Sequence, residues 1–140
     1  MQITHLLPKS QTLAFTVIFL MIGNASADDT RLMTDEESKQ TLYKCIALQT
    51  AACERLANFH IKLSAKESLT SGEDFHLGMA SQYFEMACNE TAPQNCHLAG
   101  QALRDKPTAG EHWQTKATDL FRKACNWNHS ESCEKIDKLN

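Results

Sequence analysis

The residues of this 140-residue chain that could do chemistry are six cysteines, several histidines and one Ser-x-x-Lys element. The cysteines form three pairs whose members stand eight positions apart: Cys45 and Cys53, Cys88 and Cys96, Cys125 and Cys133. An even set of cysteines in an oxidising compartment predicts disulfides, and one spacing used three times predicts a bridge within each pair. A short turn between two helices can bring such cysteines to the Cα separation of ~5.5 Å that a bridge requires. This pairing leaves no thiol to act as a nucleophile.

The Ser-x-x-Lys element is formed by Ser132 and Lys135. Penicillin-recognising serine enzymes combine this element with Ser-Asp-Asn and Lys-Thr-Gly elements, and the sequence contains neither of those. We therefore interpret Ser132 as a residue beside a helix cap and Lys135 as an exposed residue. The sequence predicts no catalytic residue.

The histidines after residue 27 do not form a metal-binding motif. They are His60, His76, His97, His112 and His129. They include no His-Glu-x-x-His element and no pair three or four positions apart. The cysteine spacing does not suit zinc, and Pro93 stands where a haem-attachment motif ending in Cys96-His97 needs its first cysteine. We expect neither a metal nor a cofactor.

Residues 1–27 are typical of a secretory signal peptide. Lys9 precedes an apolar run at 13–22, and Ala25-Ser26-Ala27 supplies the small residues of a cleavage site. The run is too short to span a bilayer, and no cysteine stands at the cleavage point to carry a lipid. We expect a released chain, residues 28–140, that is periplasmic or secreted and does not insert into the membrane.

Charge and composition exclude two broad classes. The leader holds one of the 14 Lys and Arg residues and none of the 17 Asp and Glu residues, so residues 28–140 carry a net charge of −4. Nucleic-acid binding needs a concentrated basic face, whereas these basic residues are scattered among acids. The only valine is Val17, and a composition rich in Ala, Leu, Glu, Lys and Gln favours helices over strands.

An internal repeat appears when the chain is aligned on its cysteine pairs. Residues 80–89 read Ala-x-x-Tyr-Phe-x-x-Ala-Cys-Asn, and residues 117–126, 37 positions later, read Ala-x-x-Leu-Phe-x-x-Ala-Cys-Asn. The shared apolar positions lie on one helix face. A first copy around Cys45 matches less well, since Glu37 and Thr41 replace the leading Ala and the Phe.

Each copy predicts two helices joined by a turn. Thr34-x-x-Glu37 is a capping box, Pro93 can open a helix, and Ser130 can cap one. Ser71-Gly72 and residues 105–110 are expected to separate the copies. The helices are expected at about 35–48, 50–65, 73–89, 93–104, 111–126 and 131–138. The fold class is all-α: a short α/α solenoid of three helical hairpins, each stapled by a disulfide, with repeats at about 34–66, 73–105 and 110–140.

The motif of residues 80–89, followed by Cys96 and by Ala99-Gly100 in place of a Leu-Gly pair, resembles the Sel-one-like repeat. This repeat is an α/α relative of the tetratricopeptide repeat, and the resemblance is to its disulfide-bridged, cysteine-rich branch. It covers roughly residues 37–139 and is most specific in the second and third copies. Ala57 and Asp137 replace the glycine seen as Gly100, which predicts looser helix packing in the outer copies.

The resemblance implies a curved helical surface that binds a protein or peptide partner. Some small exported members neutralise effector enzymes, and some cysteine-rich members are described as penicillin-binding proteins or weak β-lactamases. We expect a monomeric interaction module, with a weak β-lactam hydrolase as the alternative. The candidate binding residues, on the variable polar helix face and in the turn after Cys125, are Gln82, Glu85, Asp119, Arg122 and Trp127. Trp113 is expected to pack in the core, and Trp127 to cap the end of the solenoid or to contact the partner.

Overall fold

The computed structural model describes residues 32–67, 71–106 and 110–138, most of which lie in helices. The helices are α1 (Asp35–Ile46), α2 (Thr50–Lys66), α3 (Ser71–Ala87), α4 (Pro93–Arg104), α5 (Glu111–Asn126) and α6 (Ser130–Asp137). The described residues form no strand, and their one β-type contact is an isolated bridge between Asn89 and Ala92. None of these helices combines the length and the apolar character needed to cross a bilayer. The expected signal peptide lies outside the described residues.

Helix ends follow from local chemistry. The Thr34 side chain accepts a hydrogen bond from the Glu37 backbone, and the Glu37 carboxylate accepts one from the Thr34 N–H at 2.8 Å, which confirms the capping box. Pro93 is the first residue of α4, as expected from its missing N–H.

Two expected helix starts are wrong. Ser71 and Gly72 do not separate helices but begin α3. The acidic residues Glu73 and Asp74 lie in its first turn, where negative charge interacts favourably with the helix dipole. The cap of α6 is His129 rather than Ser130. Its ring Nδ1 accepts from the Ser132 N–H at 3.3 Å, because a neutral imidazole nitrogen can replace the usual hydroxyl oxygen.

The three disulfides join the cysteines that the spacing pairs. Their Cα separations are 4.7, 4.8 and 4.9 Å, and they connect α1 to α2, α3 to α4 and α5 to α6. The first and third connections also share a left-handed residue three positions after the first cysteine, Leu48 (φ 60°) and Asn128 (φ 65°). The same local chemistry therefore builds a repeat-like architecture.

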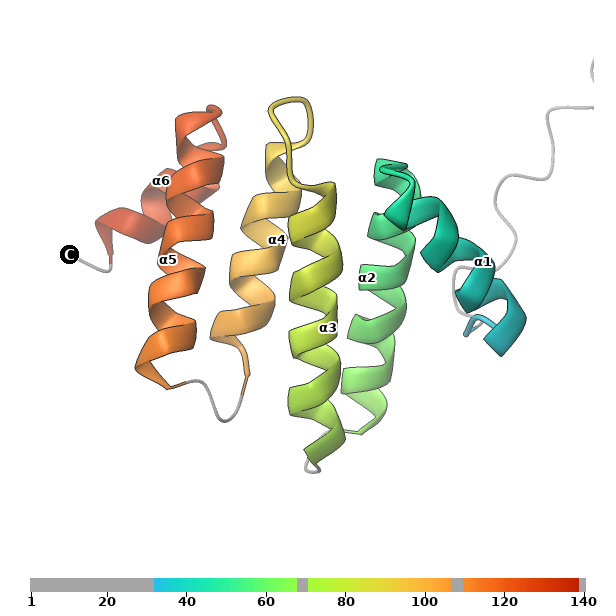
Figure 1. The fold of residues 1–140 in the computed structure, drawn as a ribbon. Coiled ribbons are helices and arrows are strands. Elements are labelled where there is room, and N and C mark those ends of the chain that lie inside the picture. The colour runs from blue at the N-terminus through green and yellow to red at the C-terminus, as the bar shows by residue number, and fades with distance from the viewer. Residues whose placement is uncertain (1–31, 68–70, 107–109, 139–140) are drawn as a thin grey trace, which may run out of the picture. The chain divides into compact units, whose positions relative to one another are not determined.

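Consecutive helices pack against one another along the chain. Figure 1 shows α2 to α5 standing side by side, with α1 and α6 at the two ends of this unit. The closest packing between bridged pairs is α2 on α3 and α4 on α5. The three disulfide-bridged pairs are thus joined through their neighbouring helices.

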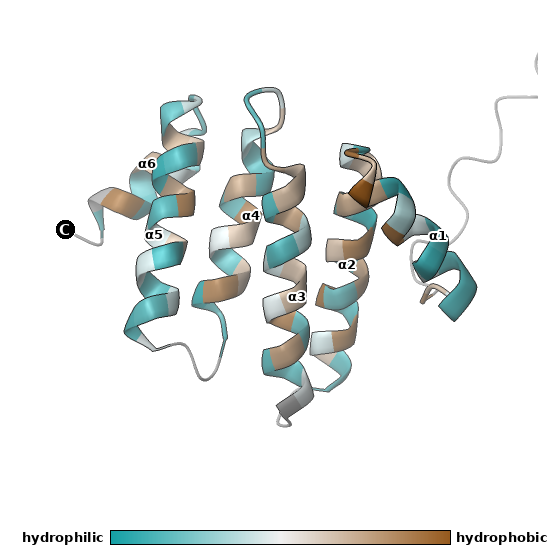
Figure 2. Ribbon diagram, in the orientation of Figure 1, coloured by the Kyte–Doolittle hydropathy of each residue, from teal (hydrophilic) through white to brown (hydrophobic). Residues whose placement is uncertain are grey.

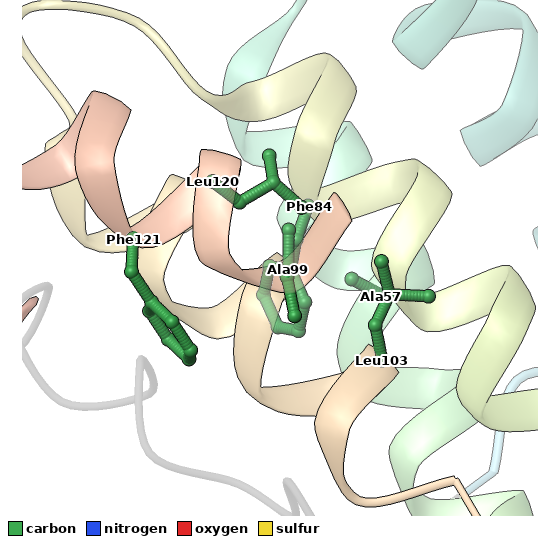
Figure 3. Packing of buried hydrophobic residues seen from close by; sticks show 7 residues of the cluster. Ala57, Phe84, Ala99, Leu103, Leu120 and Phe121 are labelled. Atoms are coloured by element: carbon green, nitrogen blue, oxygen red, sulfur yellow. The ribbon is translucent and has the colours of Figure 1, made fainter. Parts of the chain in front are cut away.

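The main core lies between α2, α3, α4 and α5 (Figure 3). Its buried members are Ala57, Phe84, Ala99, Leu103, Ala117, Leu120 and Phe121. This cluster includes Phe84, Leu120 and Phe121 of the apolar face expected from the repeat, and Trp113 packs against it as expected. Burying Phe121 alone contributes roughly 2–3 kcal/mol relative to leaving it exposed.

Gly100 sets the approach of α4 to α5. A Cβ atom at this position would lie 2.9 Å from the Ala117 carbonyl oxygen and 3.0 Å from Phe121. The backbone oxygen cannot move aside without moving α5. Close packing of α4 on α5 therefore requires glycine at this position.

Candidate functional site

The densest group of chemistry-bearing side chains joins α4 to the start of α6. The Ser132 hydroxyl oxygen lies 2.9 Å from His97 Nδ1 and 3.0 Å from His129 Nδ1. The two imidazole rings are 4.8 Å apart. Ser132 is 0% exposed and His97 is 4% exposed. One buried hydroxyl thus connects two histidines from separate segments of the chain.

A carboxylate completes this group. Glu131 Oε1 lies 3.4 Å from His97 Nε2, so carboxylate, imidazole and hydroxyl follow one another as in serine hydrolases, but with the partners of the two ring nitrogens exchanged. Burial lowers the pKa of His97, and the nearby Glu131 partly offsets that effect. A neutral His97 ring can form one hydrogen bond with the Ser132 hydroxyl through Nδ1.

The burial of Ser132 limits what this group can do. A nucleophile needs space about 3 Å from its oxygen for the reacting carbonyl. The Ser132 side chain has no exposed surface, and two imidazoles already contact its oxygen. The arrangement is suited to holding α6 against α4 rather than to attacking a substrate.

The same positions make a polar contact one pair earlier in the chain. Asn95 immediately precedes Cys96, as Ser132 precedes Cys133, and its Nδ2 donates to Glu54 Oε1 at 2.7 Å. Glu54 follows Cys53 as His97 follows Cys96. The residue after the second cysteine of one pair therefore contacts the residue before the second cysteine of the next pair. This equivalence supports a structural role for the His97–Ser132 contact.

A second histidine pair lies between α2 and α3. His60 Nδ1 and His76 Nδ1 are 2.9 Å apart, and Tyr83 stacks on the His60 ring at 5.5 Å. Glu67 Oε1 lies 3.5 Å from His76 Nε2. Burial, and secondly the charge of His76, lower the pKa of His60 to about 4.

Neither histidine cluster belongs to a local sequence motif. His60 and His76 are 16 positions apart, and His97 and Ser132 are 35 apart, so no local spacing reveals them. The His97–Ser132 contact could have been found from the positions of its two residues relative to the cysteines. Its members flank the second cysteines of successive repeats.

The predicted binding residues do not form one free surface. Glu85 pairs with Lys116 at 2.8 Å, joining α3 to α5, and Arg122 pairs with Asp119 at 2.6 Å within α5. Gln82 is exposed on α3.

Trp127 is partly buried. It packs against a small core of Cys88, Cys96 and Ala124, and the Lys123 ammonium lies over its ring. These contacts favour the capping interpretation of Trp127 over direct contact with a partner.

Exposed apolar residues lie at and near the turn between α1 and α2, where the ribbon in Figure 2 has the colour of hydrophobic residues. We define the turn patch as Tyr43, Ile46, Leu48 and Met86, all of which are exposed. Met86 belongs to α3, and its sulfur lies 3.9 Å from Cys45 Sγ. Leu48 is 84% exposed although its backbone is left-handed. No local sequence pattern reveals this patch, because Leu48 lies in the turn and Met86 on another helix.

Comparisons with known proteins found no matching family model, no matching curated protein and no matching solved structure. Among the described residues, no group of three or more His, Cys, Asp or Glu side chains is arranged to hold a metal ion. The disulfides are those of a protein in an oxidising, extracellular compartment.

Proposed function

We propose that this protein is an exported interaction module that binds a protein or peptide partner. In this proposal the three bridged helix pairs form a short α/α solenoid of the Sel-one-like type, in the periplasm or outside the cell. The observation that carries it is the turn patch. Large apolar side chains left exposed close together in the chain, as Tyr43, Ile46 and Leu48 are, favour a protein-binding site.

Leu48 gives this interpretation its physical basis. A non-glycine residue in the left-handed region costs roughly 1–2 kcal/mol, and Asn tolerates it better than Leu. The equivalent turn before α6 uses Asn128 at this position. The turn itself therefore does not need leucine, and folding gains little from a side chain left in water. Contact with a partner explains why a large apolar residue is held there.

Tyr43 adds to the patch an aromatic ring of the kind enriched in interface hot spots. The partner face is accordingly apolar, with an acceptor or donor for the Tyr43 hydroxyl. Neutralisation of a secreted effector enzyme is one form that such binding can take. The polar face with Gln82, Glu85, Asp119 and Arg122 is the second candidate surface, although its charged groups already pair with one another or with Lys116.

The experiment compares three variants in capture of partners from an envelope extract. Ile46→Glu places a charge in the turn patch, and Phe75→Glu is its matched control because both side chains are 60% exposed. Arg122→Glu tests the polar face. We expect Ile46→Glu to abolish capture of specific bands while the other two variants retain them. Equal capture by all three variants, with unchanged circular dichroism, would contradict the proposal.

A weak β-lactam hydrolase is the second candidate, favoured by the Glu131–His97–Ser132 order. Its test is turnover of a chromogenic β-lactam by the purified protein, with Ser132→Ala and Lys135→Ala. Ser130→Ala, an exposed serine in the same helix, is the control. We expect no turnover that depends on Ser132, because its hydroxyl is buried. Turnover lost in Ser132→Ala and kept in Ser130→Ala would replace the binding proposal by the hydrolase.

A further inference from the structure

The His60–His76 pair has the nitrogen–nitrogen separation of two ligands on one metal ion. Imidazole–metal bonds of ~2.0–2.1 Å that meet at a right angle place the two nitrogens about 2.9 Å apart. The Nδ1 atoms of His60 and His76 lie 2.9 Å apart, on two helices that pack closely. In the metal-free pair the two nitrogens face each other, since the ring centroids are 5.1 Å apart, so both rings must turn out of their shared hydrogen bond to direct their lone pairs at one ion.

The surroundings resemble the outer shell of a metal site. A histidine that binds a metal through one nitrogen usually donates its other N–H to a carboxylate, which fixes the tautomer. Glu67 Oε1, 3.5 Å from His76 Nε2, is placed for this role. The Tyr83 ring, tilted 24° from the His60 ring, holds that imidazole in position.

The hydrogen bond between the rings decides where their protons lie. A metal ligand must present the lone pair of a neutral imidazole nitrogen. In the metal-free pair one Nδ1 must carry the proton that the other accepts. With His76 donating through Nε2 to Glu67, that proton belongs to His60. Metal binding then requires His60 to move its proton to Nε2.

We propose that His60 and His76 form a binding site for a divalent transition metal, with Cu²⁺ bound most tightly. The described residues supply these two nitrogens and no third protein ligand of the usual kinds. A closed tetrahedral zinc site is therefore not what the pair builds. Cu²⁺ suits it better, because it accepts two adjacent nitrogens in a tetragonal plane with water in the other positions and heads the affinity order for such ligands.

The test uses the purified, untagged protein with its disulfides intact and CuCl₂ as the probe. Titration in the presence of glycine as a competitor measures the apparent Kd, and electron paramagnetic resonance reports the coordinating nitrogens. We expect one Cu²⁺ per chain with two imidazole nitrogens. His60→Gln or His76→Gln should weaken binding at least about tenfold, and Glu67→Gln by about tenfold, the lower end of outer-shell effects. His112→Gln, at an exposed histidine on α5, should change nothing.

A readout on the unmodified protein keeps the proposal testable if a histidine variant fails to fold. Substoichiometric Cu²⁺ should selectively broaden the ring resonances of His60 and His76 in the NMR spectrum. Broadening centred on His112 or His129, or Kd values unchanged in folded His60→Gln and His76→Gln, would overturn the site. Neither result bears on partner capture through the turn patch, so the two proposals are tested independently.

Discussion

The Asn95 amide donates a 2.7 Å hydrogen bond to the Glu54 carboxylate and a 3.2 Å bond to the Ala87 carbonyl. One residue of α4 is thereby fastened to α2 and to the end of α3. The equivalent step at the next pair is His97 to Ser132, at 2.9 Å. The two contacts use different side chains, but each connects the residue after the second cysteine of one pair with the residue before the second cysteine of the next pair. Successive helix pairs are therefore held in register by one polar contact as well as by their apolar faces.

Asn95→Ala should weaken this register. The substitution removes both hydrogen bonds from a side chain that is almost fully buried, one of them to a carboxylate. We expect the free energy of unfolding to fall by about 1.5–3 kcal/mol, measured by urea denaturation. Gln94→Ala, at the exposed neighbouring position, is the control. Equal losses in the two variants would show that the contact contributes nothing.

Gly100→Ala should separate α4 from α5. The added methyl group would meet the Ala117 carbonyl oxygen at 2.9 Å, and overpacking of this kind costs typically ~1–3 kcal/mol. Gly78→Ala is the matched control, since its Cβ would meet only the Lys106 ammonium, at 3.5 Å. Because alanine favours a helix, Gly78→Ala should be neutral or stabilising by up to about 1 kcal/mol. Thermal melting of the two variants in parallel measures the contrast.

Stability should decrease as the solution becomes acidic. The pKa of His60 is about 4 in the folded protein, below its ordinary value of 6.5, so the unfolded chain binds more protons between these values. The contribution of neutral His60 is therefore complete above about pH 6.5 and lost as the pH falls towards 4. Its nearest groups are His76, Tyr83 and Phe59, and Glu67 is the carboxylate that faces His76.

Urea midpoints measured from about pH 7 to about pH 5 should show this loss before most carboxylates titrate. His60→Gln should flatten the dependence, because glutamine cannot gain the proton. His112→Gln should keep the wild-type slope. A slope that His60→Gln leaves unchanged would assign the effect to other groups, among them His97, whose pKa burial also lowers.

Removing the bridges one at a time should destabilise the protein unequally. Each disulfide closes a loop between cysteines eight positions apart, for which the chain-entropy model gives ~2–3 kcal/mol. Cys45 and Cys53 are also buried, whereas Cys125 and Cys133 are partly exposed. The double Cys→Ala variant of the first bridge should therefore lose more packing than that of the third. Calorimetric melting of the variants tests this order.

Much of the architecture was determined by local sequence. Cysteines eight positions apart are bridged here across a short helix–turn–helix connection. The apolar positions at helical spacing define the buried face with Phe84 and Phe121. The Thr34 capping box and Pro93 likewise set two helix starts. Interactions between near neighbours in the chain can be read from sequence because their geometry is fixed by the helix itself.

The tertiary structure alone decided which distant polar groups meet. The His60–His76 pair, the Glu54–Asn95 bond and the burial of Ser132 depend on how neighbouring helices rotate and slide against each other. The sizes of the side chains between the helices, such as the absence of a Cβ at Gly100, set how the helices pack. No spacing of residues within one helix encodes this packing. The cap of α6 shows the same limit, since His129 took the role expected of Ser130 while its ring also contacts the buried Ser132 hydroxyl. Polar chemistry in this protein is produced by packing between helices, and packing is a property of the whole chain.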